Sequence, residues 1–113
     1  MALLKGTLDV LVLKTLSWSP MHAFEIESWI EDRSEGRVQV DDAALLQALH
    51  RLEARKLLRA AWGVTGNGRR ARYYELTAAG HRQLDAERAA WARVSAAVES
   101  VLNPRWTIAS LAL

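Results

Sequence analysis

The sequence contains no cysteine, so the chain can form neither a disulfide nor a thiolate site, which is compatible with a reducing compartment. It also lacks an apolar run long enough to cross a bilayer, since stretches such as DVLVLKTL are interrupted by charge. The first residues, MALLKGTLDV, lack the basic segment, the long apolar segment and the cleavage site of a signal peptide. We therefore expect a cytoplasmic protein that does not interact with membranes.

Catalytic and metal-binding motifs are missing as well. No Gly-x-Ser-x-Gly occurs, and the segment GNGRR lacks the Lys-Ser/Thr ending of a phosphate-binding loop. His22, His50 and His81 are too far apart in the sequence to suggest a pair of metal ligands, and no cysteine accompanies them. The sequence therefore predicts no enzyme, no metal site and no cofactor.

Charge is distributed unevenly along the chain, although the net charge is only +2. Residues 21–50 carry seven acids against two bases, whereas residues 51–72 carry seven bases against Glu53 alone. A local surplus of positive charge is typical of a protein with a polyanionic partner. On charge alone, an ordinary solvated basic face explains the pattern equally well.

The spacing of apolar residues predicts three helices in the first half of the chain. They cover about residues 3–17, 21–33 and 42–56, and Asp41 or Asp42 is the expected N-cap of the third. From Leu57 the pattern changes to two strand-like runs, LLRAAWGV and RRARYYEL, joined by the turn-forming segment TGNG. Thr77 is expected to cap a long final helix that ends near Leu102, before Pro104.

Three helices followed by a hairpin predict a winged helix-turn-helix, a mainly α fold with a two-stranded β-wing. We expect a DNA-binding domain over 1–76, a dimerisation helix over 77–103 and a tail of unknown role over 104–113. In this architecture the third helix enters the major groove of double-stranded DNA and the wing lies along the backbone. Glycines would let the wing turn project, and the arginines beside them would meet phosphates.

Several segments resemble the PadR family of transcriptional regulators. They are LLKGTLDVLVLKTL, HAFEIESWIEDRS, ALLQALHRLEARKLL and WGVTGNGRRARYYELTAAG, and the resemblance covers about residues 3–102. The short length and single C-terminal helix are similar to the smaller subfamily. The resemblance implies a homodimeric repressor that binds a roughly palindromic DNA operator and releases it when a small effector binds. The residues expected to contact DNA are Ala44, Gln47, His50, Arg51, Arg69, Arg70, Arg72 and Tyr74.

The third helix departs from the family pattern, which has a small or hydroxyl residue followed by Leu-Tyr-Pro. Leu46 stands where the family has the tyrosine, so a hydroxyl that would reach the phosphate backbone is absent. Asp41 and Asp42 also bring negative charge to the helix N-terminus, and Lys56 replaces a glycine. These departures favour an alternative, in which a winged-helix dimer binds proteins or small molecules and has weak or no specific affinity for DNA.

The final helix carries an apolar stripe at heptad spacing, since five of the six positions from Leu84 to Val101 are apolar. Such a stripe suits packing against a second helix, although it could also pack on its own domain. We expect it to form the dimer contact, as the resemblance also implies. The expected interface residues are Leu84, Trp91, Val94, Val98, Val101 and Leu102.

Trp91 aligns with a tryptophan that some members of the smaller subfamily use to stack a planar drug between two subunits. Two indoles across a dyad would form an aromatic slot for a small aromatic effector. The expected neighbours in the slot are Leu8, Val12, Glu87, Arg88 and Val94. The alternative is that Trp91 simply packs in the helix seam. Trp106 in the tail could close over the dimer.

Overall fold

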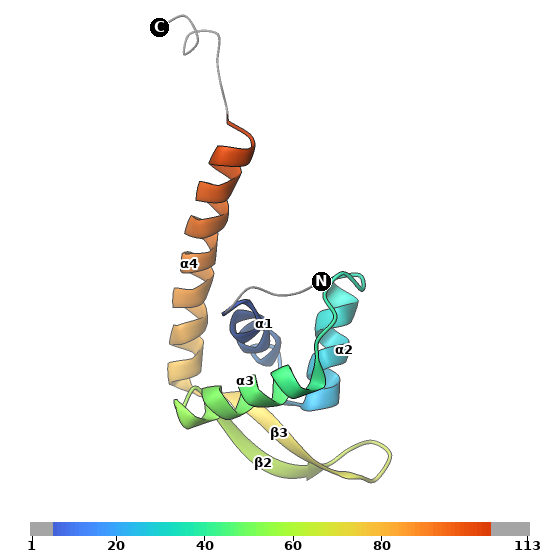
Figure 1. Ribbon diagram of the computed structural model, residues 1–113. Coiled ribbons are helices and arrows are strands. Elements are labelled where there is room, and N and C mark those ends of the chain that lie inside the picture. The colour runs from blue at the N-terminus through green and yellow to red at the C-terminus, as the bar shows by residue number, and fades with distance from the viewer. Residues whose placement is uncertain (1–5, 105–113) are drawn as a thin grey trace, which may run out of the picture.

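The computed structural model describes residues 6–104 of the chain. In this part, three helices pack together above a small sheet and a fourth helix rises from it as a long arm (Figure 1). The elements are α1 (Thr7–Leu16), β1 (Met21–His22), α2 (Ala23–Arg33), α3 (Asp42–Ala54), β2 (Leu58–Val64), β3 (Arg70–Leu76) and α4 (Ala78–Leu102). The mainly α winged helix-turn-helix expected from the sequence is confirmed. The tail from Arg105 onward, including Trp106, lies outside the described residues.

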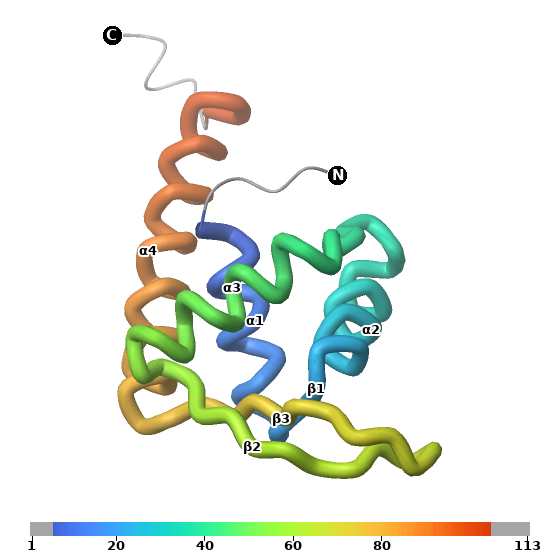
Figure 2. The backbone as a smooth tube through the Cα atoms, turned by 60° about the horizontal axis from the view of Figure 1, so that its bottom comes forward, coloured from blue at the N-terminus to red at the C-terminus, as the bar shows by residue number. Residues whose placement is uncertain are grey.

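The core lies between the first three helices and the inner face of the sheet. On α3 the residues Leu45, Ala48, Leu49 and Leu52 recur every three or four positions, so they share one face and are buried. The three leucines belong to the same cluster as apolar residues of α1, α2 and both long strands. The opposite face of α3 therefore remains in solvent, above the β2–β3 hairpin (Figure 2).

Local signals set most helix boundaries as expected. The Asp41 side chain accepts a hydrogen bond from the Ala44 N–H at 2.9 Å and caps α3. The Thr77 hydroxyl accepts one from the Gly80 N–H at 3.0 Å and caps α4, which ends at Leu102 before Pro104. Both caps and the end of the final helix are confirmed.

The second helix begins two residues later than expected, because Met21 and His22 form a short strand. They pair with Tyr74 and Tyr73 of β3, so the antiparallel sheet has the order β1-β3-β2. The expected two-stranded wing is confirmed as the β2–β3 hairpin, and the sequence analysis missed the short third strand beside it. His22 also caps α2, because its Nδ1 accepts a hydrogen bond from the Glu25 N–H at 3.4 Å.

The turn after α3 packs against the base of α4 and holds it in place. Lys56 adopts a left-handed backbone conformation with φ of 62°, which explains why a glycine is typical of the family at this position. Its carbonyl accepts a hydrogen bond from the Thr77 hydroxyl at 2.8 Å. Gly80 lies so close that a Cβ atom there would meet the Leu57 carbonyl oxygen at 2.2 Å. The first turn of α4 is thus fixed against the link between α3 and β2.

Candidate nucleic-acid interface

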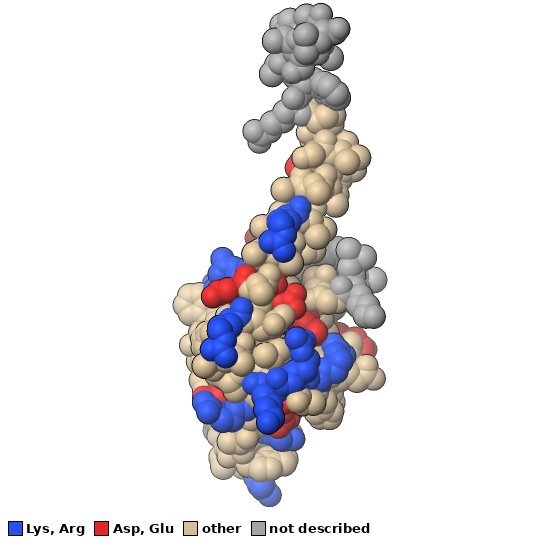
Figure 3. All heavy atoms as spheres, turned by 90° about the vertical axis from the view of Figure 1, so that its left-hand side faces the viewer, with Lys and Arg blue, Asp and Glu red and all other residues tan. Residues whose placement is uncertain are grey.

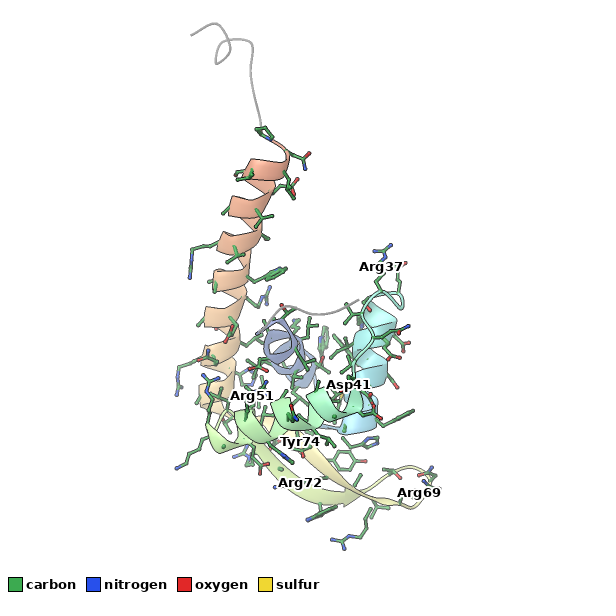
Figure 4. All side chains as sticks on the ribbon, viewed as in Figure 1. Arg37, Asp41, Arg51, Arg69, Arg72 and Tyr74 are labelled. Atoms are coloured by element: carbon green, nitrogen blue, oxygen red, sulfur yellow. The ribbon has the colours of Figure 1, made fainter. Side chains whose placement is uncertain are left out.

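The wing is the β2–β3 hairpin, whose turn projects beyond the helical core. Thr65 and Arg69 close this turn, since the Thr65 N–H donates to the Arg69 carbonyl at 2.8 Å. Gly68 has a φ of 83°, so the turn needs a residue without a side chain at that position. Arg69 consequently lies at the far end of the hairpin and is exposed (Figure 4).

Arg70 is held on the wing by an aromatic side chain. The pairing Val64↔Arg70 and Trp62↔Arg72 places Arg70 diagonally across from Trp62 on the same face. The Arg70 guanidinium lies 4.8 Å from the centre of the Trp62 ring, and both side chains are exposed. Sequence reasoning missed this contact, because it depends on the strand register.

Arg72 ties the wing to α3 instead of pointing freely into solvent. Its Nη2 lies 2.6 Å from Oε2 of Glu53 on α3, and its guanidinium lies over the Tyr74 ring. Tyr74 itself is only 3 % exposed, because its register opposite Ala60 turns the ring toward the core. This burial raises the pKa of the Tyr74 phenol. The expectation that Tyr74 contacts DNA was therefore wrong.

The expected contacts on α3 fall into two groups. Gln47 and His50 lie on the exposed face, whereas Ala44 is half-buried on its flank. Arg51 also lies on a flank, where its Nη2 is 2.7 Å from Oδ1 of Asp9 on α1. Arg51 and Arg72 are thus each paired with a carboxylate, while Arg69 and Arg70 make no ion pair with any described residue (Figure 4).

Acidic side chains gather where α3 begins. Asp41 is engaged as the cap, and Asp42 lies near Glu27 of α2. Burial, followed by the neighbouring charges of Asp42, Glu31 and Asp41, raises the pKa of Glu27 from 4.5 to about 7. Negative charge at a helix N-terminus opposes the attraction of that end for phosphate. The cationic character of this surface therefore comes from the wing and not from the start of α3.

A cleft of about 710 Å³ lies between the wing turn and the start of α2. It is lined on one side by His22, Phe24 and Glu25, and on the other by the segment from Thr65 to Ala71. Arg69 and Arg70 stand on the wing side, and Phe24 is exposed on the other. The two arginines therefore border one side of this cleft, opposite the apolar ring of Phe24 and the carboxylate of Glu25.

Comparison with known proteins identifies the family. The sequence profile of the transcriptional regulator PadR-like family matches residues 12–86, which include α2, α3, the whole wing and the base of α4. The chain belongs to the PadR-like family. A family of transcriptional regulators agrees with the expectation that the chain is not an enzyme.

Solved structures share the PadR fold over most of this chain. A PadR family transcriptional regulator from Eggerthella lenta is 27 % identical with a TM-score of 0.75, and the match covers 89 % of this chain and 86 % of that one. A PadR-like transcription factor from Bacteroides fragilis is 28 % identical with a TM-score of 0.69, covering 86 % and 91 %. An uncharacterized protein from Lysinibacillus sphaericus is 26 % identical over 97 residues, which are 86 % of this chain and 89 % of that protein.

The apolar stripe of the PadR chain's last helix is exposed beyond its first turns. Leu84 is buried within its own domain, so it does not lie on the free part of the stripe, contrary to expectation. Trp91, Val94, Val98, Val101 and Leu102 follow, and each is about half exposed or more. The described residues therefore bury none of these side chains. Figure 1 shows that α4 extends well beyond the three-helix core.

The residues expected around an effector have mixed positions. Val12 was wrongly assigned, because it is fully buried in the core and cannot line an open slot. Leu8 is half-buried on α1, and Glu87 accepts a hydrogen bond from the Gln83 side chain at 2.9 Å. Arg88, Trp91 and Val94 are exposed on α4.

The base of α4 also carries a mixture of basic and acidic side chains on the face in Figure 3.

Two structural absences concern residues 6–104, the part of the chain that the structure describes. None of the helices described there is both long and apolar enough to span a bilayer. The same residues contain no group of three or more histidines and acids placed to hold a metal ion.

Proposed function

We propose that the chain is a homodimeric repressor that binds a DNA operator through α3 and the wing and is released by a small planar or hydrophobic effector. The observation that carries the proposal is the placement of Arg69 and Arg70. Both are exposed, lack an acidic partner among the described residues, and lie on a hairpin that projects beside α3. Family membership supports a role in transcription, and the arginines supply the charge that phosphate binding requires.

In the proposed complex α3 enters the major groove and the wing follows the sugar-phosphate backbone. Arg69 at the turn is free to move toward phosphate. Arg70 rests against Trp62, so less side-chain entropy is lost when it binds. The Arg72–Glu53 ion pair keeps the base of the wing at a constant position relative to α3, so α3 and the wing form one DNA-binding surface.

The proposed dimer forms through α4. This helix has 25 residues and is about 37 Å long, and its apolar stripe is exposed from Trp91 onward. Soluble monomers rarely leave so continuous an apolar stripe uncovered. A second α4 is a fitting cover, because the heptad spacing of Trp91, Val94, Val98 and Val101 matches the spacing of knobs in a helix pair. Two-fold pairing would present two wings to a palindromic site.

The proposed effector binds near Trp91, whose indole is 50 % exposed in the single chain. Two such indoles across the dimer axis would make a flat apolar slot, with Leu8 and Val94 as further apolar neighbours and Arg88 and Glu87 as polar ones. A ligand there would change the angle between the two α4 helices and so the spacing of the two wings. Fluorescence and DNA binding measured with 1-anilinonaphthalene-8-sulfonate test this step: Trp91→Ala should abolish release by the dye. Because Trp91 also belongs to the proposed dimer contact, the variant is compared with the wild type at protein concentrations at which sedimentation shows both to be dimeric.

Salt dependence of DNA binding tests the central proposal. Wild-type protein is titrated with duplex DNA from the upstream region of its own gene and with a scrambled duplex, at several salt concentrations. Specific binding should be at about 10⁻⁸ M or tighter with a steep salt slope. The double variant Arg69→Ala, Arg70→Ala removes four phosphate contacts per dimer, so the slope should fall by about 3.6. Equal affinity of the wild type for both duplexes would contradict the proposal.

Arg93→Ala is the matched control for this experiment. Arg93 is an exposed arginine on α4, two residues after Trp91 and therefore on the opposite side of the helix from the apolar stripe. The substitution removes one positive charge per chain, half of the charge that the double variant loses, and it lies away from α3 and the wing. The slope should stay at the wild-type value. A similar fall in both variants would mean that only the overall charge matters.

The alternative function is a winged-helix dimer that binds a protein or small molecule and has weak or no specific affinity for DNA. Two observations favour it: the acids Asp41, Asp42 and Glu27 surround the start of α3, and the basic residues Arg51 and Arg72 are neutralised by carboxylates. The ratio of affinities for the upstream and scrambled duplexes separates the two functions, since the alternative predicts a ratio near one.

A further inference from the structure

The outward face of α3 carries no basic side chain over its N-terminal half, and its first residue, Asp42, is acidic. Ala43, Leu46 and Gln47 are all exposed there, and His50 follows one turn later. Asp41 caps the helix and Arg51 pairs with Asp9, whereas Asp42 is exposed one turn before Leu46. The surface that would enter a major groove thus offers two apolar side chains and one amide before any cation.

Leu46 stands out on this face because it is 45 % exposed although the other leucines of α3 are buried. Helical geometry places it between the outward residues and the flank that carries Glu53, seven residues further along. Glu53 holds the wing arginine Arg72, so Leu46 lies on the side of α3 that faces the wing root. No described residue covers this side chain enough to bury it.

We propose that Leu46, with Ala43 beside it, contacts the 5-methyl groups of thymines in the major groove, and that Gln47 binds an adenine next to them. This rests on the proposed DNA-binding function. The thymine methyl is the apolar group that the major groove presents, and glutamine matches the N6 and N7 edge of adenine. Leucine can neither donate nor accept a hydrogen bond, so a base edge with only polar groups would lose its water without replacement.

Guanine recognition at these positions is disfavoured by the same geometry. Guanine is usually bound by an arginine or lysine that donates to O6 and N7. Arg51, the arginine within α3, lies on a flank with its guanidinium 2.7 Å from Asp9. Asp42 adds negative charge at the start of the helix, which opposes the acceptor-rich edge of guanine. The middle of each half-site is therefore expected to be A·T.

The test compares thymine with uracil, which differs from it only by the 5-methyl group. A duplex enriched by wild-type protein from a random pool is synthesised with deoxythymidine or with deoxyuridine in the half-sites, and the two dissociation constants are measured. Loss of one methyl contact corresponds to a factor of about four, or about fifteen for the two half-sites of a dimer. In Leu46→Ala the uracil-to-thymine ratio should fall clearly below the wild-type value, because only the smaller contact of Ala43 remains.

Two controls keep the outcomes separate. Val64→Ala removes an exposed apolar side chain from the wing and should retain the wild-type ratio. Gln47→Ala should also retain the ratio but lose the preference for adenine at the neighbouring base. A wild-type ratio of one, or an unchanged ratio in Leu46→Ala, would overturn the inference without affecting the proposed function. Failure to enrich any duplex would instead overturn the proposed function and the inference with it.

Discussion

Replacing Val98 by aspartate should dissociate the proposed dimer. Val98 lies in the middle of the exposed stripe of α4 and is 49 % exposed in the single chain. Covering the remaining half of a valine side chain contributes about 1 kcal/mol, or about 2 kcal/mol for the two copies in a symmetric dimer. Aspartate loses this contribution and adds two carboxylates whose desolvation costs at least about 2 kcal/mol each. The sum of about 6 kcal/mol raises the dimer dissociation constant by about 10⁴-fold.

Sedimentation equilibrium over a range of protein concentrations measures this change. Ala96→Asp is the matched control, because it adds the same charge two residues earlier, on the side of α4 that faces away from the stripe. The control should sediment like the wild type, and Val98→Asp should be monomeric at micromolar concentration. The reasoning is refuted if Val98→Asp remains dimeric there, or if both variants weaken the dimer equally.

The remaining predictions concern stability. Lys56→Gly should raise the free energy of unfolding by about 0.5–1 kcal/mol in urea denaturation, because glycine adopts the left-handed conformation of Lys56 without strain; a loss of stability would contradict this. Gly80→Ala should lower it by about 3 kcal/mol, because its Cβ would meet the Leu57 carbonyl oxygen at 2.2 Å; a neutral result would show that α4 is not seated as described. Folded protein holds the Glu27 proton more tightly than the unfolded chain does, so the contribution of Glu27 to stability is complete below pH 4.5 and is lost as the pH rises toward about 7. Glu27→Gln should flatten this fall in denaturation curves recorded across that range, and an equally steep fall would exclude Glu27 as its source.

Short-range signals made most of the fold predictable from the sequence. Asp41 and Thr77 each act on an N–H group three residues away, so their roles as caps could be inferred without knowing the fold. The asymmetry of charge around residues 51–72 likewise pointed to the wing, and the periodicity of the last helix pointed to its apolar stripe. Each of these inferences depends on residues within a few turns of one another.

Long-range pairing made the rest unpredictable. Arg51 meets Asp9 from 42 residues away and Arg72 meets Glu53 from 19 residues away, so the chain alone could not show that these cations are neutralised. Tyr74 and Tyr73 are adjacent, and only the strand register decides that Tyr74 is the one turned inward. The short strand at Met21 was missed for the same reason, because its two residues acquire strand geometry only by pairing with β3.

Because Gly80 packs closely against Leu57, α4 is fixed at its base, and a small tilt of the helix becomes a large displacement at its far end. The helix is about 37 Å long and is anchored at one end to the turn that also ends α3. If the helix tilts by about 5° about its anchored base, its distal end moves by about 3 Å for this length. In the proposed dimer, each α4 carries its own winged helix-turn-helix through the same rotation as a rigid unit. A compound the size of one ring system could therefore change the separation of the two wings without changing the structure of either wing.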